Sequence, residues 1–159
     1  MIHFLNQRPL KLVHSFLIYL SIIFFTIISM EIVAILSHKY IMHGPGWFLH
    51  KSHHKKHSNK FELNDLYFIV FSIPSIYCIY SGYSNQNFIL TSIGIGILCY
   101  GLIYIILHDI VVHKRFGITI NSKNYYLRKI KKSHLIHHSN QEKKMQVILV
   151  LFHTYDLLL

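Results

Sequence analysis

Acidic residues and cysteines are scarce in this chain of 159 residues. It has 6 aspartates and glutamates against 16 lysines and arginines, which gives a formal net charge of +10. Such an excess in a soluble protein suggests nucleic-acid binding. This chain is 52% hydrophobic, so we expect instead a membrane protein whose basic residues flank its spans and contact anionic lipid, with no nucleic-acid partner. Both cysteines, Cys78 and Cys99, lie in apolar runs, which argues against a disulfide or a cysteine metal site.

Charge is also missing from three long runs. Residues 13–30 and 88–107 contain 18 and 20 residues without lysine, arginine, aspartate or glutamate, and a third such run begins at residue 66. About 20 helical residues cross the hydrocarbon core of a bilayer. The first run lacks a signal-peptide cleavage pattern, so we expect it to remain as a span. The prediction is one domain over 1–159, an all-α integral membrane protein of three to four transmembrane helices, with spans at about 13–36, 66–81 and 88–107.

Basic residues predict the orientation of these spans. The loop 82–87 contains no lysine or arginine, whereas segments 38–65 and 108–144 hold 14 of the 16 basic residues. Lysine and arginine concentrate on the cytoplasmic side of membrane proteins. We therefore expect both segments to form a helical cap on the cytoplasmic face of the cytoplasmic membrane.

Histidine is the residue in excess, with 14 in the chain. Ten of them follow one order, HxxxxH and then HxxHH, which occurs twice. These ten are His38, His43, His50, His53, His54, His108, His113, His134, His137 and His138. Each cluster lies at or after the cytoplasmic end of a predicted span, so all four should converge above one membrane face. The other four (His3, His14, His57 and His153) fall outside the pattern, and we expect ordinary surface or hydrogen-bonding roles for them.

The two spacings differ in what a helix does with them. In HxxHH, residues i, i+3 and i+4 share one helix face, so three imidazoles can point at one place. In HxxxxH the two residues lie about 140° apart on a straight α-helix, which is poor geometry for one ion. That spacing fits a helix end, a local distortion, or two ligands aimed at different members of a metal pair.

Ten imidazoles are more than one ion can bind. Neutral imidazole suits zinc, copper, iron and nickel, and a structural zinc needs only four ligands. Two octahedral ions would take about five nitrogens each and keep a position for oxygen, which favours a redox pair that binds dioxygen. Above an apolar bundle, such a pair of iron ions could hydroxylate a lipid-dissolved substrate. The alternative is a non-catalytic metal-binding or metal-transporting membrane protein. Transport favours polar residues inside the spans, but residues 13–30 and 88–107 hold almost nothing ionisable, only His14 at one end.

Three polar residues are candidates to orient the metal-binding histidines. Metal-bound histidines usually donate their second ring N–H to a carboxylate or carbonyl oxygen. Asp109 adjoins His108, and Asn64 and Asp65 precede the second span. For Asn64 and Asp65, helix capping explains the position equally well. Glu31 lies near the end of the first span, where a carboxylate is either functional or marks the membrane interface.

Several stretches together resemble the bacterial-type β-carotene 3-hydroxylase family. They are the segment 30–54 with its first two histidine clusters, Phe61-Glu-Leu-Asn-Asp-Leu-Tyr, Tyr100-Gly-Leu-Ile-Tyr through His108-Asp, Val112-His-Lys-Arg-Phe, and Tyr126-Leu-Arg-Lys-Ile through His138. The similarity covers about residues 20–140 and includes residues between the histidines. After the last cluster the chain departs from the family pattern, since residues 145–159 lack the family's Gly- and Phe-containing stretch.

The resemblance implies a non-haem di-iron monooxygenase of the fatty acid hydroxylase superfamily. Such an enzyme uses dioxygen to hydroxylate C3 of each β-ionone ring, converting β-carotene to β-cryptoxanthin and then zeaxanthin. Electrons come from reduced ferredoxin, ultimately from NAD(P)H, and the basic face could dock an acidic ferredoxin or meet lipid. The ten histidines match the family's ligand positions. A sterol or fatty-acyl hydroxylase or desaturase of the same superfamily is the alternative.

Overall fold

A computed structural model describes residues 7–55, 61–118, 120 and 123–139. Every regular element among them is a helix, which confirms the predicted all-α class. The elements are the α-helices α2 (Gln7–Leu36), α3 (Trp47–His50), α4 (Asp65–Ser84), α5 (Phe88–Tyr104) and α6 (Tyr125–Ser139), the π-helices η1 (Ser37–Met42) and η2 (Ile105–Val112), and the 3₁₀-helix η3 (Arg115–Gly117).

Three helical stretches of the described chain are long and apolar enough to cross a membrane. They are Lys11–Met42, Asp65–Ser84 and Phe88–Val112, and they cover the three predicted spans. Large apolar side chains face outward from them; Phe25 and Tyr77 are each 65% exposed. Apolar surface of this extent is the kind that lipid covers. The first stretch continues from α2 into η1 without a break, so η1 extends the helix that carries it.

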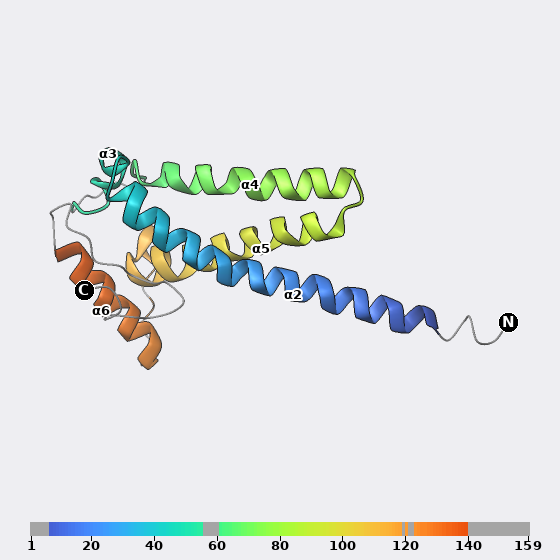
Figure 1. Ribbon diagram of the computed structural model, residues 1–159. Helices are drawn as coiled ribbons and strands as arrows, with labels where there is room; N and C mark the ends of the chain where they lie inside the picture. The colour runs from blue at the N-terminus through green and yellow to red at the C-terminus, as the bar shows by residue number, and fades with distance from the viewer. Residues whose placement is uncertain (1–6, 56–60, 119, 121–122, 140–159) are drawn as a thin grey trace.

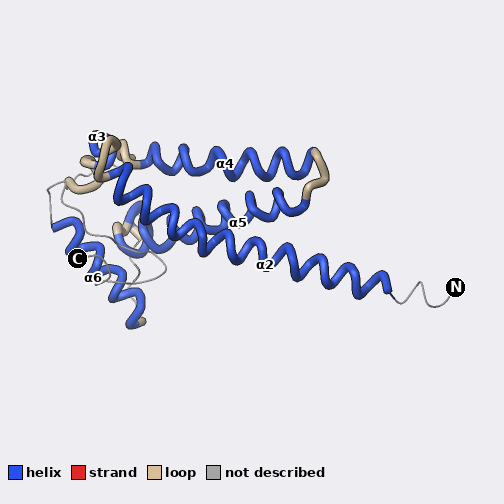
Figure 2. The backbone as a smooth tube through the Cα atoms, in the orientation of Figure 1, coloured by secondary structure: helices blue, strands red, loops and turns tan. Residues whose placement is uncertain are grey.

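The bundle is a helical hairpin with a third helix lying along it (Figure 1). α4 and α5 are joined by a short turn at residues 85–87, and α5 packs along both α4 and α2. α3 and α6 lie at the end away from that turn, together with residues 37–42 and 105–112 (Figures 1 and 2). The histidine-bearing segments therefore share one end of the bundle, as the sequence predicted.

Two glycines allow α5 to approach both of its neighbours. A Cβ atom on Gly94 would lie 2.7 Å from Ile79 in α4, and one on Gly96 would lie 2.6 Å from Thr26 in α2. Residues two apart on an α-helix differ by about 200°, so α4 and α2 pack on opposite sides of α5. In the described part of the chain, α2 and α4 do not pack along each other. Space is left between them.

Replacing Gly96 with alanine is expected to destabilise the bundle by about 1–3 kcal/mol, the usual range for overpacking. The added Cβ would meet the Thr26 side chain at 2.6 Å and the Ile23 carbonyl oxygen at 3.0 Å. Unfolding of the purified protein in detergent measures the loss. Gly101→Ala is the matched control, because the nearest atom to its new Cβ is a ring carbon of Phe68 at 4.0 Å. An equal loss in both variants would contradict this account of α5.

Candidate metal centre

The HxxxxH pairs lie on π-helices, and this brings their rings together. The backbone N–H of His43 donates to the carbonyl of His38 at 3.0 Å, and that of His113 donates to the carbonyl of His108 at 3.0 Å. A hydrogen bond from residue i+5 to residue i places the two residues one above the other. The ring centroids are accordingly only 4.6 Å apart in the first pair and 4.7 Å apart in the second. Of the geometries that the spacing left open, the structure combines two, because each local distortion stands at the end of a helix.

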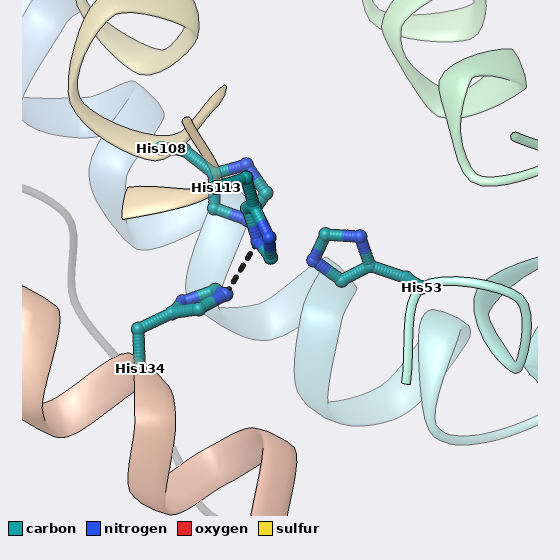
Figure 3. A group of neighbouring side chains, drawn as sticks. All are labelled: His53, His108, His113 and His134. Carbon is teal, nitrogen blue, oxygen red and sulfur yellow. Dashed lines mark hydrogen bonds between the residues drawn. The ribbon is translucent and has the colours of Figure 1, made fainter. Parts of the chain in front are cut away.

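The histidine nitrogens gather into two groups. In each group, one ligand nitrogen per residue lies within 4.8 Å of all the others. The first group is His38, His43 and His50; the second is His53, His108, His113 and His134. His54 adjoins the first group, with its Nε2 3.2 Å from His50 Nε2, and His138 adjoins the second, with its Nε2 2.7 Å from His134 Nε2. Figure 3 shows the four rings of the second group turned toward one another, with His53 facing the other three.

The distances within the second group suit ligands of a shared ion. His134 Nε2 lies 2.7 Å from the Nε2 atoms of both His113 and His138. One imidazole nitrogen carries either a proton or a lone pair, so it cannot donate to one neighbour and accept from the other. With metal–nitrogen bonds of about 2.1 Å, ligand nitrogens at right angles lie about 3 Å apart. His53 Nε2 is buried and has no hydrogen-bond partner among the described residues, as expected of a ligand atom. The residues present therefore fit a metal.

Three histidines each have a side-chain oxygen, a hydrogen-bond acceptor, beside the Nδ1 atom. His50 Nδ1 lies 2.7 Å from Asn64 Oδ1, His53 Nδ1 lies 3.1 Å from Glu62 Oε1, and His108 Nδ1 lies 2.8 Å from Asp109 Oδ1. A proton on Nδ1 leaves the Nε2 lone pair free for a metal and fixes the orientation of the ring.

Burial favours the neutral form of three imidazoles, those of His50, His53 and His138. It lowers the pKa of His50 to about 3 and that of His138 to about 4, and neighbouring histidines add to the effect in both cases. For His50, the hydrogen bond with Asn64 opposes this shift and is outweighed. Burial, followed by four surrounding histidines, also lowers the pKa of His53 well below its ordinary value. Neutral imidazole is the form that binds metal ions.

The structure places the predicted orienting residues differently from one another. Asn64 and Asp109 contact histidines directly, and the Asn64 side chain makes no capping hydrogen bond to α4. Asp65 instead accepts from the backbone N–H of Glu62 at 3.0 Å and pairs with Arg115 at 2.8 Å. Asp65 is therefore connected to the histidines through Glu62, whose side chain contacts His53.

The remaining predicted positions are less informative. His137 lies in α6, but its side chain is outside the described residues, as are His3, His57, His153 and the segment 145–159. His14 is exposed on α2, consistent with a surface role.

Glu62 and Arg115 are not among the site residues that the sequence predicted. Glu62 is a site residue by its contact with His53, and Arg115 by its bond to Glu62 at 2.8 Å. A signal was available, because both lie in stretches that carry the family resemblance. The scarcity of acids was another, since four of the 6 acidic residues gather here: Glu31, Glu62, Asp65 and Asp109.

Glu31 lies inside the bundle and is only 1% exposed. The Tyr100 hydroxyl donates to its Oε2 atom at 2.9 Å. One turn further along the chain, the Tyr104 ring stacks on the His108 ring, with centroids 4.5 Å apart and an interplanar angle of 23°. These contacts therefore lead from the buried Glu31 carboxylate toward the histidines.

A cavity of about 280 Å³ connects the bundle to the histidines. Glu31, Phe71 and Ile97 are among the residues of its walls, and at one end it reaches His53 and His108. Several of its apolar lining residues are more than half exposed: Phe68, Ile76 and Leu102. The cavity therefore communicates with the surroundings of the spans as well as with the histidines.

Comparison with known proteins confirms the family resemblance. The chain is 44% identical over 123 residues to the beta-carotene hydroxylase of Pantoea ananas, covering 77% of this chain and 70% of that protein. It is 39% identical over 128 residues to the beta-carotene hydroxylase of Pseudescherichia vulneris (80% and 69%), and 35% identical over 119 residues to the chloroplastic beta-carotene 3-hydroxylase 2 of Arabidopsis thaliana (73% and 39%). No family model and no solved structure matches the chain. Identity at this level over about 70% of the length of the bacterial relatives shows that the chain belongs to the β-carotene hydroxylase family.

Proposed function

We propose that this protein is a membrane-bound carotenoid hydroxylase that acts on C3 of β-ionone rings, from β-carotene through β-cryptoxanthin to zeaxanthin. The observation that carries the proposal is a largely apolar cavity that ends on a buried cluster of histidines. The names of the relatives support hydroxylation of a carotenoid. A lipid-dissolved substrate also agrees with a site at the end of three membrane-spanning helices.

The proposed cofactor is a pair of iron ions held by the ten histidines. The first histidine group with His54 would hold one ion, the second group with His138 would hold the other, and His137 stays a predicted ligand. Imidazole nitrogen is a suitable ligand for iron. Bound there, the two ions would supply activation of dioxygen and attack on an unreactive C–H bond.

The chain's own residues orient the histidine rings and exclude water from the site. The side-chain oxygens of Asn64, Glu62 and Asp109 accept hydrogen bonds from the Nδ1–H groups of their histidines. These bonds fix the orientation of each ring and of its Nε2 atom. Tyr104 covers one face of the His108 ring. The apolar walls of α2, α4 and α5 exclude water from the C–H bond to be attacked.

The cavity volume limits how much of the substrate can enter. About 280 Å³ is near the lower end of the range for pockets that take drug-sized ligands. It suits one ring with the adjoining part of the polyene, and not a whole carotenoid. The rest of the molecule would pass between α2 and α4, which do not pack along each other in the described chain, into the lipid.

We further propose that the histidine end faces the cytoplasm and receives electrons from reduced ferredoxin, ultimately from NAD(P)H. The excess of lysine and arginine in the segments around the site supports this orientation. Lys51, Lys55 and Lys114 are exposed at this end and favour an acidic donor protein.

Expression in cells that accumulate β-carotene is expected to yield β-cryptoxanthin and zeaxanthin, identified by chromatography and mass spectrometry of the pigments. His108→Ala is the matched inactive control, since it removes a residue of the second group. Unchanged β-carotene, with the protein present and iron bound, would reject the carotenoid as substrate. Protein that binds metal without altering any lipid would favour the non-catalytic alternative.

Metal exchange tests the iron assignment. Zinc binds nitrogen sites more tightly than iron(II), so overexpressed protein is expected to carry zinc and to be inactive. Removal of the metal and reconstitution with iron(II) should restore hydroxylation, with metal content followed by elemental analysis. Full activity of the zinc form would contradict a redox role for the metal.

Filling the cavity at Gly101 is expected to impair substrate binding without loss of metal. A Cβ atom there meets only Phe68, at 4.0 Å, so a leucine side chain has room to project into the cavity. Gly101→Leu should raise the apparent KM or lower turnover at least about tenfold, as expected when a ring loses about 1.4 kcal/mol of binding. Gly101→Ala is the control. Equal kinetics of Gly101→Leu and wild type, with iron content unchanged in both, would remove the ring from this cavity.

A further inference from the structure

Arg115 bonds to three of the acidic residues beside the histidines. Its Nη2 atom lies 2.8 Å from Glu62 Oε1 and 2.8 Å from Asp65 Oδ1, and its Nη1 atom lies 3.5 Å from Asp109 Oδ2. The Arg115 side chain is 15% exposed and that of Glu62 is 6% exposed, so the pair is largely shielded from solvent. A shielded guanidinium with several carboxylate partners has far less freedom than a surface arginine.

Two of these carboxylates also hold histidines. Glu62 Oε1 faces both Arg115 and His53 Nδ1, the latter at 3.1 Å. Asp109 divides its two oxygens: Oδ1 faces His108 Nδ1 at 2.8 Å, and Oδ2 faces Arg115. A continuous chain of contacts therefore runs from His53 through Glu62, Arg115 and Asp109 to His108.

This chain of contacts joins the two halves of the histidine repeat. His53 comes from the first HxxHH motif and His108 from the second HxxxxH motif, yet their rings stack with centroids 5.0 Å apart and an interplanar angle of 23°. His53 and His108 also belong to one ligand group. The relative orientation of the two rings therefore depends on what connects the segment around residue 62 to η2.

The backbone around Arg115 explains how the side chain reaches back. Lys114 has φ +52°, a left-handed conformation that turns the chain sharply after η2. Arg115 then begins the short helix η3. On the other side of the contact, Asp65 accepts from the Glu62 N–H, which closes the segment 62–65 into a turn that presents two carboxylates to one guanidinium.

We propose that Arg115 is a positioning residue of the metal centre: it holds Glu62 and Asp109, and through them fixes the orientation of His53 and His108 toward the same ion. The inference rests on the proposed metal centre. A planar guanidinium has five N–H donors in a rigid fork and can serve carboxylates on more than one side, whereas a lysine ammonium has three donors around one point. The charge alone is therefore not sufficient, and lysine should not replace Arg115.

The test compares Arg115→Lys and Arg115→Met with Arg128→Met, an exposed arginine on α6. Each purified protein is loaded with iron(II), and release of iron to a chelator is followed with time. Mutation of a residue that orients metal ligands typically lowers metal affinity by about 10–100-fold. We expect release to be at least about tenfold faster in both Arg115 variants, and unchanged in Arg128→Met. Mössbauer spectra should also change in Arg115→Lys, but not in the destabilised Gly96→Ala protein, which keeps every residue of the proposed metal centre.

Double variants show whether Arg115 acts through the carboxylates. If it does, adding Glu62→Gln to Arg115→Lys should speed iron release little beyond the faster single variant, because both changes break the same chain of contacts. The same holds for Asp109→Asn. Multiplication of the two single effects would mean independent roles and would overturn the inference.

The outcomes separate the two proposals. If the wild-type protein binds no iron, the proposed metal centre fails. If wild type binds iron and Arg115→Lys releases it at the wild-type rate with an unchanged spectrum, the metal centre stands and the role of Arg115 is overturned. Thermal unfolding of each variant in detergent is measured alongside, and if Arg115→Met does not fold, Arg115→Lys decides.

Discussion

The histidine end of the protein depends on two backbone hydrogen bonds, each reaching one residue further than an α-helix allows. The bonds from His43 to His38 and from His113 to His108 make both HxxxxH motifs π-helical. Without them the paired rings would lie about 140° apart and face different surroundings. π-helical turns are rare and recur at functional sites, where they redirect side chains. Here each one ends a long membrane helix, so each ring pair is attached directly to a span.

Much of the fold was predictable because lipid constrains the sequence strongly. A span needs a long run without charge, and the three runs in this chain became the three long helices. The histidine pattern also identified its own members, since an ordered repeat is improbable by chance. The spacing of HxxxxH correctly signalled that a straight α-helix would not serve, but it did not select among the remaining geometries. That choice depends on contacts between segments, which no local pattern contains.

Other features lie beyond local patterns for the same reason. His53 joins histidines from the opposite half of the repeat, and Glu62 bonds to Arg115, which follows η2. Glu62 and Arg115 are 53 residues apart in the chain and have no spacing in common with the histidines. Their partnership is visible only once the segments meet. Most of the few acidic residues of the chain lie near the histidines, and each of these carboxylates has a hydrogen-bond or ion-pair partner.

α5 lies between its two neighbours, and this arrangement also bears on the order of events in a reaction. α2 and α4 pack on opposite sides of α5, and the cavity is lined by all three helices. It has one end at the histidines and communicates elsewhere with the surroundings of the spans. A long substrate with a reactive ring at each end can present only one ring at a time to such a site. To present the other, it must withdraw, reverse its direction and enter again. For the proposed carotenoid substrate, this geometry would favour a distributive enzyme, which releases a half-modified intermediate into the bilayer, where another enzyme molecule can compete for it.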